Sequence, residues 1–246
     1  MYTSIEYEKI DHIALITLNR PKAGNAADLK MVQELEEACM QINGDGDICV
    51  VTVTGAGGVF CTGRDTADGP FETGPASFIA GIECPVIAVI NGDALGEGLE
   101  IALSCDIRLA AEGVRLGLPQ ASRGLMPVDG GTQRLPRIVG RGKALEMLLA
   151  ADVITAEEAL EIGLVSMVFA AESLPDEARN LADTIAAKGP LALRYLKEAV
   201  IKGMDMTLDQ GLRLEADLYF LLHTTADRTE GIEAFREKRK PEFKGE

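Results

Sequence analysis

Residues 86–111 read Val-Ile-Ala-Val-Ile-Asn-Gly-Asp-Ala-Leu-Gly-Glu-Gly-Leu-Glu-Ile-Ala-Leu-Ser-Cys-Asp-Ile-Arg-Leu-Ala-Ala, and this stretch decides the fold class. Its opening apolar run is too short for most helices and predicts a strand over residues 86–91 that is buried on both faces. A glycine-rich turn follows, then a helical pattern around residues 98–104 and another strand over residues 106–111. Strand, helix and strand in this order predict parallel strands joined by a right-handed crossover, and therefore an α/β fold.

The same unit precedes this stretch. Alternating apolar residues predict a strand over residues 13–18, which the breaker Asn19-Arg20-Pro21 ends. Asp28 is expected to cap a helix, because an apolar stripe at helical spacing follows it as far as the Asn-Gly-Asp-Gly sequence of residues 43–46. The β-branched run over residues 48–54 then predicts the next buried strand.

After Gly130 helical patterns dominate. Thr155 with Glu158, and Thr207 with Gln210, have the spacing of capping boxes, and Gly189-Pro190 predicts a break between helices. Residues 164–169 predict one further short strand. The expected organisation is an α/β body over residues 1–190 and an all-helical part over residues 191–246, with no low-complexity linker between them.

The charge of the chain excludes several classes of function. The sequence has 246 residues with 24 Lys+Arg and 39 Asp+Glu, so its formal charge is 24 − 39 = −15. Such a chain would repel a phosphate backbone, so neither nucleic-acid nor anionic-membrane binding is expected. No apolar run is long enough to span a bilayer and no export signal is recognisable, which predicts a cytoplasmic protein. The five cysteines lie mostly in apolar runs without a C-x-x-C pair, as reduced core residues do.

Two glycine-rich corners, residues 55–65 and 91–100, each follow a predicted buried strand. Such corners leave backbone N–H groups unpaired, and the second corner also opens a helix, whose dipole favours negative charge. Two such donors aimed at one point would form an oxyanion hole for a thioester carbonyl as it becomes an enolate. Either corner taken alone is typical of an ordinary tight turn. No metal-binding motif, nucleophile elbow or complete nucleotide-binding motif is present, so no metal site is expected.

The motifs, taken in order, resemble the crotonase superfamily of enoyl-CoA hydratases and isomerases. The resemblance rests on six segments: Leu18-Asn-Arg-Pro-Lys-Ala-Gly-Asn-Ala26, Val59-Phe-Cys-Thr-Gly-Arg-Asp65, Ala94-Leu-Gly-Glu-Gly-Leu-Glu-Ile-Ala-Leu-Ser-Cys-Asp-Ile-Arg108, Gly117-Leu-Pro-Gln120, Gly130-Gly-Thr-Gln-Arg-Leu-Pro-Arg137 and Glu230-Gly-Ile-Glu-Ala-Phe-Arg-Glu-Lys-Arg-Lys240. It covers nearly the whole chain. It implies a spiral of β-β-α turns with a C-terminal helical trimerisation part, assembly as a homo-trimer or a dimer of trimers, and an acyl-CoA thioester as substrate.

The resemblance assigns the oxyanion hole to the backbone N–H groups of Arg64 and Glu97. The family usually has glycine where this chain has Glu97, and a backbone donor survives that change if the backbone conformation is tolerated. The Glu97 carboxylate is then expected to point away from the hole, because its charge would oppose the enolate.

Hydratases of this family usually use two glutamates, which correspond here to Glu100 and Gln120. Glu100 is the expected general base that takes a proton from water attacking C3 of the enoyl group. The Gln120 amide exchanges no proton at neutral pH, which leaves three alternatives. Glu100 acts alone as base and then acid, with Gln120 positioning the water; another acid, Asp129 or Asp68, replaces the missing glutamate; or the activity has shifted to double-bond isomerisation or been lost. Asp129 has a competing interpretation as the cap of the helix that follows it.

Hydration ranks first among these functions, ahead of isomerisation and of a silent acyl-CoA-binding homologue. The chemistry needs no metal or redox cofactor, since backbone dipoles hold the enolate and coenzyme A arrives as part of the substrate. The resemblance implies CoA contacts at Lys22, Ala23, Ala26 and Thr62, and, from the last helix across a subunit interface, at Phe235 and Lys238.

Overall fold

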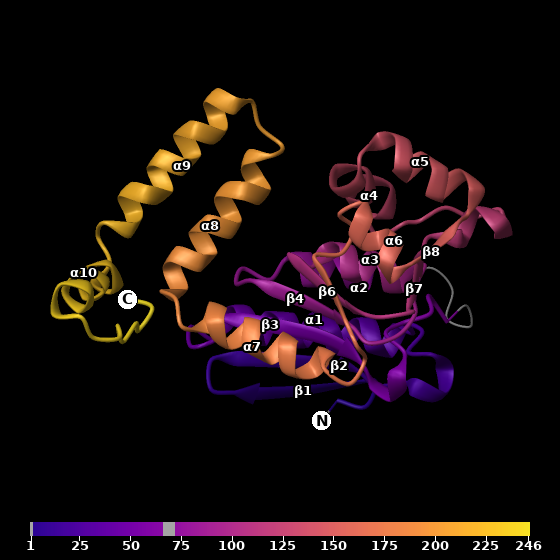
Figure 1. Cartoon of the computed structure of the whole chain (residues 1–246), viewed down its shortest axis with the longest axis horizontal. Helices are drawn as coiled ribbons and strands as arrows, with labels where there is room; N and C mark the ends of the chain where they lie inside the picture. The colour runs from indigo at the N-terminus through magenta and orange to yellow at the C-terminus, as the bar shows by residue number, and fades with distance from the viewer. Residues whose placement is uncertain (1, 66–71) are drawn as a thin grey trace.

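The computed structural model describes residues 2–65 and 72–246. Its larger sheet has the strand order β1-β2-β3-β4-β6-β9, in which β1 and β2 are antiparallel and every other neighbouring pair is parallel (Figure 1). The strands are β1 (Ile5–Ile10), β2 (Ile13–Leu18), β3 (Val50–Gly55), β4 (Val86–Ile90), β6 (Ile107–Ala111) and β9 (Met167–Phe169). The α/β class and the strands predicted at residues 13–18, 48–54, 86–91, 106–111 and 164–169 are confirmed.

Four short or exposed strands, β1, β5 (Ala94–Leu95), β7 (Arg115–Gly117) and β8 (Val153–Thr155), were not predicted from the apolar pattern of the sequence. The sequence of β1 alternates poorly and most of it is partly or fully exposed; a turn at Asp11, whose φ is +52°, connects it to β2. The other three strands form a smaller sheet in the order β5-β7-β8. Strands of two or three residues are too short to show an alternation of apolar and polar residues. They are recognised in the structure only from their backbone pairing.

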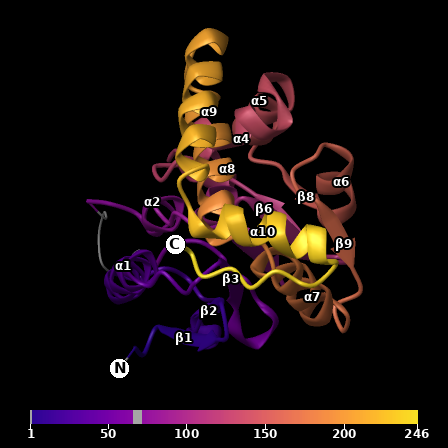
Figure 2. The ribbon, with the colours of Figure 1, turned by 90° about the vertical axis from the view of Figure 1, so that its left-hand side faces the viewer.

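Helices cover both faces of the larger sheet. Figures 1 and 2 show α1 (Leu29–Gly44) and α7 (Leu174–Ala186) on opposite sides of it. The α1 helix begins as predicted, because the Asp28 side chain accepts a hydrogen bond from Met31 N at 2.7 Å. Its buried stripe includes Met31, Leu35 and Ile42, which pack into the core.

The remaining helices of the body surround α3 (Glu97–Ser104), which is buried along most of its length. The α2 helix (Pro75–Ala80) and α4 (Gly131–Val139) pack against it, and α5 (Arg141–Ala150) packs on α4. The α6 helix (Ala156–Glu161) begins with the capping box predicted at Thr155 and Glu158. Burying α3 fixes the position of the glycine corner from which it starts.

The last helices, α8 (Pro190–Gly203), α9 (Leu208–Leu222) and α10 (Ala226–Glu237), extend away from the body (Figure 1). The predicted break at Gly189-Pro190 and the capping box at Thr207 and Gln210 are both present. The hairpin of α8 and α9 exposes large apolar side chains at Leu196, Val200, Ile201, Met204, Leu208, Leu212, Tyr219, Phe220 and Leu221. Across the described residues, each helix is too short or too polar to cross a membrane.

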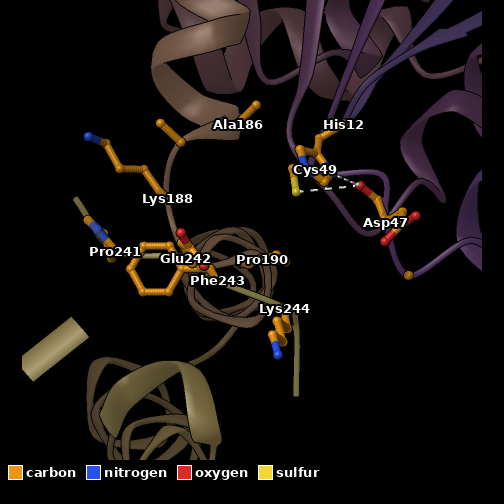
Figure 3. Close-up of a pocket in the computed structure, with 12 residues that line it drawn as sticks. His12, Asp47, Cys49, Ala186, Lys188, Pro190, Pro241, Glu242, Phe243 and Lys244 are labelled. Atoms are coloured by element: carbon orange, nitrogen blue, oxygen red, sulfur yellow. Dashed lines mark hydrogen bonds between the residues drawn. The ribbon is translucent and has the colours of Figure 1, made fainter. Parts of the chain in front are cut away.

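The C-terminal tail turns back toward the body. The buried carboxylate of Asp227 accepts hydrogen bonds from Lys244 N at 2.7 Å and Gly245 N at 2.9 Å, which fixes the end of the chain beside α10. A cavity of about 330 Å³ lies between this tail and the edge of the sheet near His12 and Cys49 (Figure 3).

Candidate active site

The two glycine corners meet at one point of the structure. Cys61 and Ala94 form a parallel bridge in which Leu95 N donates to the Cys61 carbonyl oxygen at 2.9 Å. Gly98 allows α3 to approach this bridge, because a Cβ atom at that position would overlap the same carbonyl oxygen. Residues some 35 positions apart in the sequence are therefore held side by side.

The backbone at both corners suits an oxyanion hole. Gly96 has φ +56° and ψ −125°, a conformation that L side chains rarely adopt, and it caps the helix that Glu97 begins. The N–H of Glu97 therefore lies in the first turn, where helical N–H groups have no partner within the helix. At the other corner, Ala27 N donates to Gly63 O and Asp65 N donates to Ala27 O, so by strand alternation the Arg64 N–H points away from residue 27.

A cavity of about 360 Å³ opens in front of these groups. Both corners and the segment after β7 form its wall, with Thr62, Gly63, Arg64, Leu95, Gly96, Glu97, Pro119, Gln120, Arg123, Leu125, Met126 and Val128 as lining residues. The last three apolar side chains are exposed at its mouth. The mixture of one apolar wall and a few convergent polar groups is typical of a small-molecule site.

Glu100 lies one helical turn after Glu97 in α3 and is 0% exposed. Its Oε1 atom accepts hydrogen bonds from Asp129 N at 2.7 Å and Gly131 N at 2.8 Å. Its other oxygen, Oε2, is buried and makes no hydrogen bond with the residues that the structure describes. One oxygen is thus fixed by the backbone, while the other can carry a proton without breaking a hydrogen bond to the described residues.

Burial raises the pKa of Glu100 to about 7. The two backbone N–H groups oppose this change by stabilising the ionised form, whereas the nearby charges of Glu97 and Asp129 add to it. A carboxyl group that titrates close to neutral pH can both accept and return a proton, which suits general acid–base catalysis.

The Asp129 side chain binds the first turn of α2. Its carboxylate accepts hydrogen bonds from Ala76 N at 2.6 Å and from Ser77 Oγ at 2.5 Å, at the start of α2. The expectation that it caps the helix after it is wrong, since Gly130 occupies the cap of α4 without a side-chain bond. Asp129 caps α2 instead, because the fold brings the two segments together. Whether its carboxylate also replaces the missing acid stays a prediction.

Gln120 belongs to the short turn that follows β7. Both polar atoms of its amide are buried without a hydrogen-bond partner among the described residues. Its Nε2 atom lies 3.6 Å from the position that a Cβ would occupy on Gly96. The amide is therefore at the cavity wall beside the second corner, where it can position a bound group.

The side chain of Glu97 differs from the expectation. Its Oε2 atom lies 3.6 Å from the position that a Cβ would occupy on Gly63, and both residues line the cavity. The prediction that this carboxylate points away from the hole is wrong. Glu97 and Glu100 are three residues apart, so they share one face of α3, and the helix turns both toward the same region.

The four residues expected to contact CoA on the body lie together near the first corner. Thr62 N donates to Gly24 O at 2.9 Å, which joins Thr62 to the turn that carries Lys22, Ala23 and Ala26. Lys22, Ala23 and Thr62 are exposed and Ala26 is half-buried. Their role in binding CoA remains a prediction.

Two further residues build this turn, although sequence reasoning did not single them out. Arg20 forms ion pairs with Asp28 at 3.1 Å and Asp65 at 3.0 Å, which tie the turn to the first corner. Asn25 is fully buried, with φ +53°, and its Nδ2 donates to Val59 O at 2.7 Å. Both residues lie in the segment Leu18 to Ala26, on which the family resemblance partly rests, and that position could have identified them.

Phe235 and Lys238 lie elsewhere. Phe235 is 85% exposed on α10 and Lys238 ends that helix with φ +57°. Figure 1 shows α10 at the end of the long axis opposite to α3 and β7. Within one chain these two residues are therefore not brought to the cavity. The neighbouring Arg239 pairs with Glu230 and Glu237, so part of the basic run is neutralised by its own helix.

The other candidate acid, Asp68, lies outside the described residues. Over residues 2–65 and 72–246, no cluster of three or more His, Cys, Asp or Glu side chains is arranged to hold a metal ion. All the cysteines of the sequence are buried free thiols.

Comparison with known proteins adds to this geometry. Residues 8–246 match the model of the enoyl-CoA hydratase/isomerase family. The chain is 40% identical to a crotonyl-CoA hydratase of Syntrophomonas wolfei, with 98% of each chain covered, and 41% identical to a 2,3-dehydroadipyl-CoA hydratase of Escherichia coli, with 95% of each covered. The crystal structure of an enoyl-CoA hydratase from Bacillus anthracis superposes with a TM-score of 0.95 at 39% identity, over 99% of this chain and 100% of that one. The chain has the crotonase fold and belongs to the enoyl-CoA hydratase/isomerase family.

Proposed function

We propose that this protein adds water to the double bond of a 2-enoyl-CoA thioester, and removes it in the reverse direction. The observation that carries the proposal is Glu100, a buried carboxyl group whose Oε2 has no hydrogen-bond partner among the described residues and whose pKa is raised by burial to about 7. Relatives named as hydratases at about 40% identity support the same chemistry.

The geometry supports a simple sequence of steps. The thioester oxygen accepts hydrogen bonds from the N–H groups of Arg64 and Glu97, which stabilise the negative charge that develops as the enolate forms. In the minimal mechanism, Glu100 takes a proton from the water whose oxygen bonds to C3, and returns a proton to C2. Gln120 positions the water through its amide. Since backbone dipoles hold the enolate, the reaction needs no metal or redox cofactor.

Coenzyme A enters as part of the substrate, and we assign its binding to two regions. The turn with Lys22, Ala23 and Ala26, together with Thr62, lies beside the first corner and can contact the CoA moiety there. Phe235 and Lys238 lie at the other end of the same chain, so they can complete the site only when it faces α10 of a neighbouring subunit (Figure 1).

Assembly as a homo-trimer or a dimer of trimers is therefore part of the proposal. The apolar side chains exposed on α8 and α9 form a surface that a monomer would leave in water. Residues 1–190 would then form the acyl-CoA-binding body and residues 191–246 the assembly part. The free thiols fit the cytoplasm as the compartment.

A second candidate is enoyl-CoA isomerisation, because the family model covers both activities and a single carboxylate suffices for a 1,3-proton shift. Incubating the protein with crotonyl-CoA and, in parallel, with a 3-enoyl-CoA separates the two. We expect loss of the enoyl absorbance with the first substrate. Conversion of the 3-enoyl thioester without hydration of crotonyl-CoA would establish the isomerase instead.

The variant Gln120→Glu tests whether this chain is active as it stands. If the wild-type protein is inert while Gln120→Glu hydrates crotonyl-CoA, the native protein is not a hydratase. That outcome would favour a silent acyl-CoA-binding homologue.

A further inference from the structure

Glu97 is a carboxylate that the minimal mechanism does not use. It replaces a glycine that the family usually has, and its Oε2 atom lies beside Gly63 on the wall of the same cavity as Gln120. A charged side chain placed next to an oxyanion hole would lower activity unless it takes part in the reaction, because a fixed negative charge destabilises an enolate.

Resting on the hydratase function proposed above, we propose that Glu97 is the second proton-transferring carboxylate of the site, and that it acts with Glu100 in place of the glutamate missing at Gln120. The two side chains are three residues apart in the first turn of α3 and lie on one face of it. Glu97 is half-buried and reaches the cavity, whereas Glu100 is fully buried behind it.

Glu97 and Glu100 are buried to different extents, and this difference assigns a separate role to each. Burial favours the proton on Glu100, whereas Glu97 is half-buried and lines the open cavity, so we assign the activation of water to Glu97 and the donation of a proton to Glu100. Glu97 takes a proton from water as the water oxygen bonds to C3 and the π electrons move toward the thioester oxygen. Glu100 then gives its proton to C2, and the new C2–H bond completes the 3-hydroxyacyl product. A proton passes from Glu97 back to Glu100 to restore the pair.

This order of events avoids repulsion between the Glu97 carboxylate and the negative charge of the enolate. Glu97 becomes neutral at the moment when the thioester oxygen gains charge, so the negative charge moves from one to the other. The buried Gln120 amide, with both polar atoms unpartnered among the described residues, is placed to hold the attacking water. The other charged groups facing the pair are Asp129, from the loop before α4, and Arg64 and Arg123, which line the cavity.

The test compares hydration of crotonyl-CoA by the wild-type protein, Glu97→Gln, Glu97→Gly and the double variant Glu97→Gly/Gln120→Glu. We expect Glu97→Gln and Glu97→Gly to lower kcat by about 100-fold or more, with KM changed only a few-fold. The double variant, which moves the carboxylate to the position usual in the family, should recover most of the lost kcat. Glu161→Gln, on the exposed end of α6, is the matched control and should keep wild-type kinetics.

The pH profile distinguishes a catalytic Glu97 from one with a structural role. The wild-type enzyme needs the proton on Glu100, so its kcat/KM should fall as pH rises above about 7. In Glu97→Gln, Glu100 must itself be ionised to take the water proton, so the remaining activity should fall below about 7.

An active wild-type protein whose Glu97→Gln variant keeps both its kcat and its pH profile would overturn the inference and leave the hydratase function intact. A wild-type protein that does not hydrate crotonyl-CoA would instead refute the function itself.

Discussion

At the scale of single residues, the sequence predicted positions well and side-chain directions poorly. The family resemblance identified Glu100, and the structure buries this residue in the first turn of α3, after the second corner. Glu97 was expected to point away because its charge would oppose an enolate, yet its carboxylate lies beside Gly63. Asp129 had a competing interpretation as the cap of its own helix, yet its carboxylate binds the start of α2, some 50 residues earlier. Such contacts arise from tertiary packing and have no local signature in the chain.

The raised pKa of Glu100 predicts how this residue affects stability. Its ordinary pKa is 4.5 and burial raises it to about 7, so the folded state holds its proton more tightly than the unfolded chain. The titration of Glu100 should therefore reduce the free energy of unfolding by roughly 3 kcal/mol as pH rises between these two values. Glu100→Gln should escape that loss, and its free energy of unfolding should exceed that of the wild-type protein at pH 8 but not at pH 4.

Urea denaturation of both proteins at the two pH values measures this difference directly. If the difference in free energy of unfolding between the two proteins were the same at both pH values, Glu100 would have an ordinary pKa in the folded protein.

At the scale of helices and strands, long elements with a clear period were predictable and short ones were not. The stripe on α1 and its Asp28 cap could be read directly, as could the buried runs of β3 and β4. The strand β1 could not, because tertiary hydrogen bonds fix it. Glu34 of α1 accepts hydrogen bonds from Ser4 N at 2.7 Å, Thr3 N at 3.0 Å and Ile5 N at 3.1 Å.

These bonds make Glu34 a testable anchor for β1. Burial alone would raise its pKa, but the backbone donors Ser4, Thr3 and Ile5 outweigh burial and lower it. Glu34→Ala should therefore reduce the free energy of unfolding at pH 7 by about 1–3 kcal/mol, since buried N–H groups lose their acceptor. The gap should shrink as pH falls below the ordinary carboxyl range, because the wild-type side chain then gains a proton.

Denaturation of Glu36→Ala, an exposed glutamate on the same helix, provides the control and should match the wild-type protein within about 0.5 kcal/mol. A Glu34→Ala variant as stable as this control would show that the strand is held by other contacts.

At the scale of the whole molecule, the resemblance was more informative than any local pattern. The apolar periodicity and the capping residues indicated where helices begin and end. They did not predict that α8, α9 and α10 extend away from the body (Figure 2). The helical part was predictable from the sequence, whereas the distance between α10 and the cavity became visible only in the structure. That distance is the reason the proposed CoA site needs a neighbouring subunit.

The exposed apolar face of the α8–α9 hairpin predicts the assembly state. Sedimentation equilibrium of the wild-type protein should give three or six times the chain mass of 26.2 kDa. Val200→Glu and Leu212→Glu, at side chains that are 65% and 54% exposed in the single chain, should shift the protein toward smaller species. Gln33→Glu, which adds the same charge at an exposed position on α1, should leave the mass unchanged. A wild-type monomer at micromolar concentration would contradict the proposed assembly.

The proposed function requires Glu100 to move a proton in the hydration of an enoyl thioester. The most direct measurement is the turnover of crotonyl-CoA by the wild-type protein and by Glu100→Gln, followed by loss of the enoyl absorbance at pH 7. The prediction is that the wild-type protein is active and that the variant loses about 100-fold to 10,000-fold in kcat while remaining folded. A folded Glu100→Gln variant that matches the wild-type rate would contradict it.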